Sequence, residues 1–196
     1  MAPDEPAAPP QTERAVFLDR DGVLIADVDH LTSANQIQVL PRVPDALALL
    51  RAAGWRLIIA TNQSVVARGW LDEAQLRGIH RALTAELAAR GATIDAVYYC
   101  PHHPEGAVAA YRRVCECRKP NPGMLLQAAR DWRLDLRRSV IVGDAASDVE
   151  AGRRAGCHTL LIRGAAAGQA DPDPATADFI APDLWTGAAW IISHLR

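Results

Sequence analysis

Lysine is almost absent from this sequence. Of the 21 basic side chains, all but Lys119 are arginine. Because the two residues substitute easily on solvated surfaces, chance alone could leave one lysine at some position. Lysine, however, carries a compact ammonium with three donors, which suits close approach to a phosphoryl oxygen. Since Lys119 lies among other chemically active residues, we treat it as a candidate anion-binding side chain.

Long apolar runs and an excess of one charge are also absent. The 196 residues carry 21 basic and 23 acidic side chains, which gives a formal net charge of -2. Proteins that bind nucleic acids or membrane surfaces usually carry a basic excess, and no apolar run here reaches the length of a membrane span. We therefore expect no nucleic-acid partner and no membrane insertion. A small anionic substrate stays compatible, because it needs only a few local cations.

Residues 1–14 are rich in proline, alanine and charge, and they contain no apolar core. This composition predicts a disordered leader and not a signal peptide. Four cysteines without such a signal indicate a reducing compartment, where grouped cysteine and histidine bind metal more often than they form disulfides. We expect a cytoplasmic protein with a single domain over residues 15–196, since this length suits one core.

Apolar runs alternate with helical patterns along the rest of the chain. Runs typical of buried parallel strands occupy 15–18, 56–60, 96–99, 139–142 and 159–162, with a short edge strand at 179–180. Helical spacing covers 44–53, 72–90, 122–132, 147–155 and 184–194. The alternation predicts an α/β fold with a doubly wound, Rossmann-like parallel sheet. Ligands bind such sheets at the carboxyl ends of the strands.

Polar residues that suit phosphate chemistry follow these strands. Asp19 and Asp21 lie two positions apart after the first strand, so both can point to the same side. One can act as a nucleophile or metal ligand and the other as an acid and base. Thr61 to Ser64 supply hydroxyls and amides after the second strand, and Asp144 follows the fourth. Taken singly, each has an ordinary alternative as a turn residue or helix cap.

A group of cysteines and histidines lies in the long loop after the third strand. Cys100, Cys115 and Cys117 provide three thiols, and His102 and His103 provide two imidazoles. Three thiols and one imidazole fit a closed tetrahedral zinc site, which would order the loop by direct ligation. The alternative is a flexible loop with free thiols. We favour zinc, because nothing else in the loop would order it.

The motifs Asp-x-Asp-Gly, Thr, Lys and Gly-Asp-x-x-x-Asp, in this order after the expected strands, resemble those of the haloacid-dehalogenase-type phosphatases. The resemblance implies that Asp19 attacks phosphorus and that Asp21 exchanges protons with the leaving alcohol and with water. It also implies that Thr61 and Lys119 hold the phosphoryl oxygens.

The same resemblance implies a Mg²⁺ ion bound by the Asp19 carboxylate, the Asp21 backbone carbonyl and Asp144. These are ligands of the hard oxygen type that Mg²⁺ prefers. Asp148, four residues after Asp144, is left open between a residue beside the metal and an ordinary helix residue.

The cysteine-containing loop narrows the resemblance. Cys-Pro-His-His-Pro from Cys100 and Cys-x-Cys-Arg-Lys-Pro from Cys115 are similar to the heptose-bisphosphate phosphatases and the related histidinol-phosphate phosphatases. This likeness implies structural zinc, within a loop at about 100–119, on Cys100, His102, Cys115 and Cys117, with His103 the spare. It implies substrate contacts from Asn62, Gln63, Ser64, Arg68 and Arg118, of which Arg118 would meet the phosphate that is not transferred.

Two departures lie where the substrate is selected. Ala145 stands where heptose-type relatives commonly carry lysine, and residues 25–31 lack the Gly-Tyr usual there. The short spacing between Asp21 and Thr61 leaves no room for a large cap domain. We therefore expect a monomeric phosphatase of a small phosphorylated metabolite, a sugar bisphosphate such as heptose 1,7-bisphosphate. A histidinol-phosphate phosphatase and a catalytically silent, zinc-stabilised binding module are the alternatives.

Overall fold

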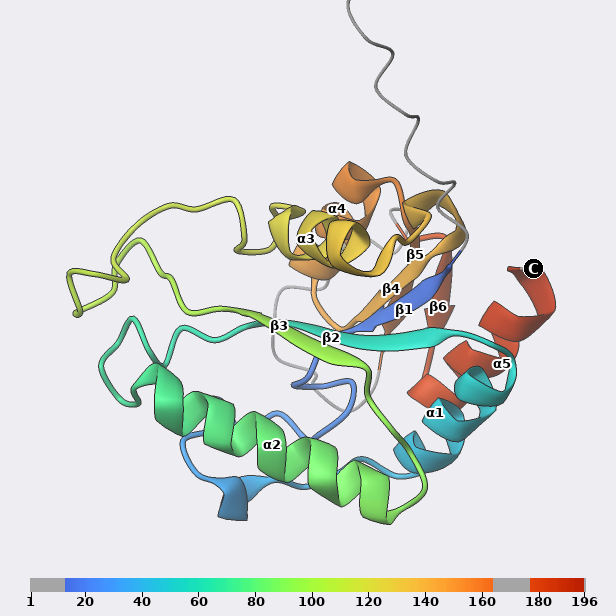
Figure 1. The fold of residues 1–196 in the computed structure, drawn as a ribbon, viewed down its shortest axis with the longest axis horizontal. Helices are drawn as coiled ribbons and strands as arrows, with labels where there is room; N and C mark the ends of the chain where they lie inside the picture. The colour runs from blue at the N-terminus through green and yellow to red at the C-terminus, as the bar shows by residue number, and fades with distance from the viewer. Residues whose placement is uncertain (1–12, 164–176, 196) are drawn as a thin grey trace, which may run out of the picture.

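The computed structural model describes residues 13–163 and 177–195, which form one six-stranded sheet with helices on both faces (Figure 1). The strands are β1 (Ala15–Leu18), β2 (Arg56–Asn62), β3 (Ala96–Cys100), β4 (Val140–Gly143), β5 (His158–Ile162) and β6 (Phe179–Ala181). All pairs are parallel, in the order β3-β2-β1-β4-β5-β6. The order reverses between β1 and β4, and ligands bind beyond the carboxyl ends of the strands at such a switch point.

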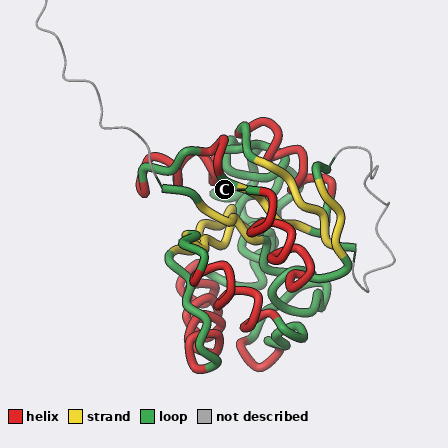
Figure 2. The backbone as a smooth tube through the Cα atoms, turned by 90° about the vertical axis from the view of Figure 1, so that its right-hand side faces the viewer, coloured by secondary structure: helices red, strands yellow, loops and turns green. Residues whose placement is uncertain are grey.

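Helices cover the two faces of the sheet unequally. They are α1 (Val43–Ala52), α2 (Glu73–Ala89), α3 (Gly123–Trp132), α4 (Ala146–Ala155) and α5 (Leu184–His194), with single 3-10 turns at Ala34–Gln36 and Leu136–Arg138. Helices α1, α2 and α5 lie on one face and α3 and α4 on the other, with the twisted sheet between them (Figures 1 and 2). Side chains alternate along β1, so they reach both faces of the sheet. Val16 and Leu18 pack into the core beneath α1, α2 and α5, and Ala15 and Phe17 pack into the core beneath α3.

The predicted fold is confirmed. Each expected strand and helix is present with ends that shift by a few residues, including the edge strand, and no large cap domain interrupts the described residues. Residues 1–12 of the expected leader lie outside the described residues. Glu13 and Arg14, which fall within the predicted leader, contact the domain: Glu13 pairs with Arg56, and the Arg14 carbonyl accepts from the Arg56 amide. None of the described helices combines the length and the apolar character needed to cross a membrane.

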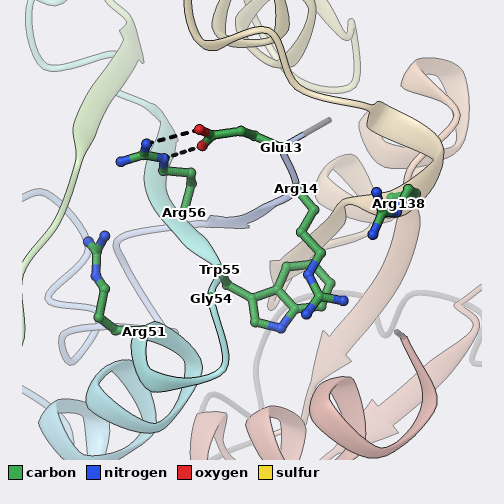
Figure 3. A pocket seen from close by; sticks show the side chains of 7 residues that line it. All are labelled: Glu13, Arg14, Arg51, Gly54, Trp55, Arg56 and Arg138. Atoms are coloured by element: carbon green, nitrogen blue, oxygen red, sulfur yellow. Dashed lines mark hydrogen bonds and ion pairs between the residues drawn. The ribbon is translucent and has the colours of Figure 1, made fainter. Parts of the chain in front are cut away.

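A cavity of about 400 Å³ lies at the amino-terminal edge of the sheet, away from the carboxyl ends of the strands (Figure 3). Its lining residues are Glu13, Arg14, Arg51, Gly54, Trp55, Arg56 and Arg138. The Arg14 guanidinium donates to the Ala53 and Leu195 carbonyls at the ends of α1 and α5. Arg56 forms ion pairs with Glu13 and Asp95. These arginine side chains join segments that are distant in the sequence. None of the predicted catalytic residues lines the cavity.

Candidate active site

The predicted nucleophile continues the β1 strand by one residue. The Asp19 amide donates to the Val142 carbonyl at 2.9 Å, which fixes the backbone at the switch point. One oxygen of its carboxylate, Oδ1, accepts from the Arg20 amide at 2.7 Å, and the other lies 3.0 Å from the Lys119 Nζ. The side chain keeps 14% of its surface exposed, so the carboxylate is held in place and yet accessible to a ligand.

The Lys119 ammonium is buried beside three acceptors. Its Nζ lies 3.0 Å from Asp19 Oδ2, 2.5 Å from Asp148 Oδ1 and 2.8 Å from the Ala60 carbonyl, and 1% of the side chain is exposed. A buried charge must be paired in this way to be tolerated. Burial by itself lowers the pKa of Lys119, but the Asp148 and Asp19 carboxylates raise it above its usual value, so the ammonium stays charged.

Asp19, Asp144 and Asp148 bring three carboxylates together, with ligand atoms all within 4.8 Å of one another. Burial, followed by the charges of Asp19 and Asp148, raises the pKa of Asp144 to about 7. One ammonium cannot balance three carboxylates, and a bound divalent cation would remove their repulsion. Such a cluster of hard oxygen donors fits Mg²⁺.

Two glycines leave room for these carboxylates. A Cβ atom on Gly22 would lie 1.9 Å from Asp144 Oδ2, and a Cβ on Gly143 would lie 2.2 Å from the Asp148 side chain. Gly22 also has a φ of +72°, which residues with a side chain rarely adopt. The backbone of the two motifs therefore closes around the acidic cluster, and glycine is required at both positions.

Asp21 is surrounded by hydrogen-bond donors. Gln63 Nε2 donates to Asp21 Oδ2 and to Thr61 Oγ1, both at 3.0 Å. Arg20 Nε donates to Asp21 Oδ1 at 3.1 Å, and Arg20 Nη2 donates to Oδ2 at 2.9 Å. Burial raises the pKa of the Asp21 carboxyl, although Arg20 opposes this shift. Because the Thr61 hydroxyl accepts from Gln63, its hydrogen is free to donate to a ligand.

The structure places the predicted substrate-contacting residues in different roles. Asn62 is engaged with the backbone of Lys119: its Oδ1 accepts from the Lys119 amide and its Nδ2 donates to the Lys119 carbonyl, both at 3.0 Å. The Ser64 carbonyl accepts from the Arg68 amide at 2.9 Å, within the turn after β2. The Arg68 guanidinium lies 5.4 Å from the Trp70 ring, and Arg118 Nη1 donates to the His102 carbonyl at 3.2 Å.

The four predicted zinc ligands come together. The Sγ atoms of Cys100, Cys115 and Cys117 are separated by 3.2 to 3.5 Å, and His102 Nδ1 lies 3.3 Å from the Sγ of Cys117. Hydrogen bonding from Cys100 lowers the pKa of Cys117, which favours a thiolate. Three thiols and one imidazole at these spacings fit a closed tetrahedral zinc site without an open position. His103 lies outside this cluster, as the spare.

The Cys/His cluster belongs to the loop that carries Arg118 and Lys119, and zinc bound there would order this loop. Beyond β3 the loop extends past the start of α2 (Figure 1), where Tyr111 Oη donates to Glu73 Oε1 at 2.9 Å. The Val108 amide donates to the Ala67 carbonyl at 2.9 Å, which joins the loop to the turn after β2. The loop therefore presents the Lys119 ammonium beside the switch point of the sheet.

We expect the change Cys115→Ser to lower the zinc content and the melting temperature together. A serine hydroxyl is a poor zinc ligand, and the loop would lose the bonds that order it. Zinc analysis and thermal unfolding of the purified protein measure both. Cys157→Ala is the matched control: Cys157 is buried outside the cluster, so this variant should keep its zinc. An unchanged melting temperature in Cys115→Ser would contradict a structural zinc.

Two residues of the site were not predicted from the sequence. Arg20 is 1% exposed and forms an ion pair with Asp21 at 2.9 Å. His80 lies on the buried side of α2, and its Nε2 is 3.3 Å from Arg20 Nη1. Both left a signal: Arg20 is a charge two residues beyond a fully buried strand, and His80 interrupts a row of buried apolar residues that includes Leu76 and Leu83.

Comparisons with known proteins agree with this geometry. The HAD-hydrolase-like family model matches residues 116–187. The chain is 46% identical over 150 residues to the D-glycero-beta-D-manno-heptose-1,7-bisphosphate 7-phosphatase of Rhodopseudomonas palustris, covering 76% of this chain and 83% of the relative. It is 42% identical over 192 residues to the D-glycero-D-manno-heptose-1,7-bisphosphate 7-phosphatase of Thermosynechococcus vestitus, covering 92% and 96%.

Among solved structures, the chain is similar to D,D-heptose 1,7-bisphosphate phosphatase from B. bronchiseptica, complexed with magnesium and phosphate. The TM-score is 0.77 at 33% identity, over 92% of this chain and 98% of that one. The chain therefore belongs to the haloacid-dehalogenase-like phosphatases, which hydrolyse phosphoric monoesters, and the family predicted from its motifs is confirmed. Within that family, the relatives that cover most of its length are named heptose-1,7-bisphosphate 7-phosphatases.

Proposed function

We propose that this protein hydrolyses the 7-phosphate of heptose 1,7-bisphosphate through a phosphorylated Asp19. The observation that carries the proposal is the cluster of Asp19, Asp144 and Asp148 around the single ammonium of Lys119. Phosphoryl transfer needs chiefly a positioned nucleophile and neutralised charge, and this cluster supplies both. The names of relatives that match most of the chain supply the sugar.

The residues then take the following roles. An Asp19 oxygen forms a bond to phosphorus while the bond to the sugar oxygen breaks, and Asp21 gives its proton to that oxygen. Asp21 next takes a proton from water, whose oxygen attacks phosphorus and releases phosphate and the Asp19 carboxylate. Thr61 and Lys119 donate to the phosphoryl oxygens. Mg²⁺, held by Asp19, the Asp21 carbonyl and Asp144, would neutralise charge on the transferred group.

Substrate selection falls to the rim of the site. Because the described residues include no large cap domain, the zinc loop and the turn after β2 border the opening. Arg118 is carried by the zinc loop, and its planar fork suits the phosphate that is not transferred. Gln63 and Asn62 act inside the site, Gln63 on Asp21 and Thr61 and Asn62 on the Lys119 backbone. Ser64 and Arg68 complete the proposed substrate-binding turn.

Two further properties belong to the same proposal. We propose that the protein acts as a monomer, because the cluster and its ligand-binding residues all come from one chain. Cys100, Cys115 and Cys117 form no disulfide and are grouped as metal ligands, which supports a reducing, cytoplasmic setting.

The substrate is tested by phosphate release in the presence of Mg²⁺. The panel contains both anomers of heptose 1,7-bisphosphate, histidinol phosphate and fructose 1,6-bisphosphate. We expect one heptose anomer to give the highest kcat/KM, by on the order of 10²-fold over the other compounds, since a site that binds particular hydroxyls rejects substrates lacking them. Asp19→Asn, purified identically, controls for contaminating phosphatases. A preference for histidinol phosphate would overturn the heptose assignment. Ala145 and residues 25–31, the two departures from the heptose-type pattern, would then be the first positions to examine.

A further inference from the structure

Arg20 is a fully buried cation whose guanidinium contacts two side chains, Asp21 and His80. It lies between Asp19 and Asp21 in the chain, and it pairs with Asp21, which is not one of the three clustered carboxylates. Its guanidinium meets the Asp21 carboxylate with two parallel bonds, from Nε at 3.1 Å and from Nη2 at 2.9 Å. This two-bond geometry fixes the orientation of a carboxylate and not only its distance.

His80 supplies the third contact of this guanidinium. Arginine is solely a donor, so the 3.3 Å contact between Nη1 and His80 Nε2 requires a lone pair on Nε2, and the ring is then neutral with its hydrogen on Nδ1. His80 is 5% exposed and its ring lies 5.4 Å from the Tyr99 ring, so its own position is fixed by the core. Helix α2 thereby supports a residue of the β1 motif.

The hydrogen bonds divide the two oxygens of Asp21 into different roles. A carboxylate offers about four acceptor positions, two on each oxygen. Oδ2 receives two donors, Arg20 Nη2 at 2.9 Å and Gln63 Nε2 at 3.0 Å. Oδ1 receives one, Arg20 Nε at 3.1 Å. The remaining acceptor position therefore lies on Oδ1, and this oxygen can carry a proton.

We propose that Arg20 and His80 are positioning residues that hold Asp21 so that its Oδ1 transfers the proton of the reaction. The inference rests on the proposed function in one respect, that Asp21 serves as acid and base. When the bond from phosphorus to the sugar oxygen breaks, the proton on Oδ1 passes to that oxygen and Asp21 becomes a carboxylate. In the second step, Oδ1 takes a proton from the attacking water, which restores the starting state.

The test uses leaving groups that differ in their need for a proton. A sugar alcohol must be protonated as it leaves, whereas p-nitrophenol leaves readily as an anion. We expect Arg20→Lys to lower kcat/KM about 10²-fold on a sugar bisphosphate that the wild type hydrolyses, and less than about threefold on p-nitrophenyl phosphate, because lysine keeps the charge and loses the fork. With p-nitrophenyl phosphate the variant should also show a burst of p-nitrophenol, since the slowed second step still needs Asp21 as a base.

His80 provides the matched pair of variants. His80→Leu removes the acceptor and should reproduce the leaving-group dependence of Arg20→Lys. His80→Gln returns an acceptor oxygen and should restore most of the lost rate. Melting temperatures identify any variant that fails to fold. If a His80 variant does not fold, the test depends on Arg20→Lys, which keeps a buried cation against Asp21.

The outcomes separate the two proposals. If Arg20→Lys lowers kcat/KM by the same factor on both substrates without a burst, or does not lower it at all, the positioning role is wrong. The proposed phosphatase function would still stand. If the wild type releases phosphate from neither substrate while Asp19→Asn behaves identically, the proposed function itself fails. A selective loss on the sugar substrate together with the burst supports Arg20 and His80 as positioning residues.

Discussion

Replacing Asp19 by asparagine should abolish phosphate release, with a loss on the order of 10⁴-fold or more in kcat, as for removal of an enzymatic nucleophile. The change replaces one carboxylate oxygen by an amide nitrogen, so the side chain keeps nearly the same size. It removes the anion that would attack phosphorus, as well as the charge that faces Lys119 Nζ at 3.0 Å. The other requirements of the site, namely Thr61, Asp144 and the zinc loop, are left in place.

The same variant should remain folded. Asp19 is one of three carboxylates whose ligand atoms lie within 4.8 Å, so removing its charge relieves repulsion while it weakens one ion pair. Circular dichroism and thermal unfolding check this expectation. Asp45→Asn is the matched control, because it makes the same chemical change on an exposed side chain of α1 and should leave turnover unaffected. Retained turnover in a folded Asp19→Asn protein would refute the nucleophile role.

The sequence carried enough information to predict where the site lies but not how its members pair. Strands β1, β2 and β4 could be predicted because apolar runs are local features, and Asp19, Thr61 and Asp144 follow from their places at or just beyond the strand ends. The three thiols and two imidazoles of the loop could be recognised as a possible zinc site from the sequence, whereas the choice of His102 over His103 came from the resemblance to the heptose-bisphosphate phosphatases.

Pairing depends instead on contacts between distant segments. Asn62 looked like a phosphate donor, but its amide closes on the Lys119 backbone, 57 residues further along the chain. The sequence alone does not decide the role of Asp148, which lies beside Lys119 Nζ because α4 and the zinc loop meet there. The contact of Arg20 with His80 likewise joins the segment after β1 to α2. Apolar periodicity says nothing about which polar side chains meet in this way.

Replacing Lys119 by arginine should lower kcat by a factor on the order of 10² to 10³, although the formal charge is unchanged. This is the range observed when an enzyme loses one hydrogen-bond donor to the charge that develops in the transition state. The three hydrogens of the ammonium match three acceptors in a fully enclosed space: Asp19, Asp148 and the Ala60 carbonyl. A guanidinium is wider and planar, and it cannot satisfy this set from the same position. Overpacking of the enclosed site should also cost about 1–3 kcal/mol of stability.

The single lysine makes this prediction measurable at the residue itself. Selective nitrogen-15 labelling of lysine gives one side-chain signal, that of Lys119, because the sequence has no other lysine. The Asp148 and Asp19 carboxylates outweigh burial and raise the pKa of Lys119. Its contribution to stability is therefore fully present below the ordinary pKa of an unfolded lysine, and it is lost only as the pH rises through the higher folded value. Titration of that signal at or below the usual lysine pKa would contradict the ion-paired site.

Arg130→Lys is the matched control, because it exchanges the same two residue types at an exposed position on α3 and should leave both turnover and melting temperature close to those of the wild type. Near-normal turnover in Lys119→Arg would show that charge alone suffices at this position. The absence of lysine from all other positions of the sequence would then be unrelated to phosphate chemistry. A large loss confined to Lys119→Arg would instead mean that the site needs the small ammonium, whose three donors are shared between the two carboxylates, the Ala60 carbonyl and, during the reaction, the phosphoryl oxygens.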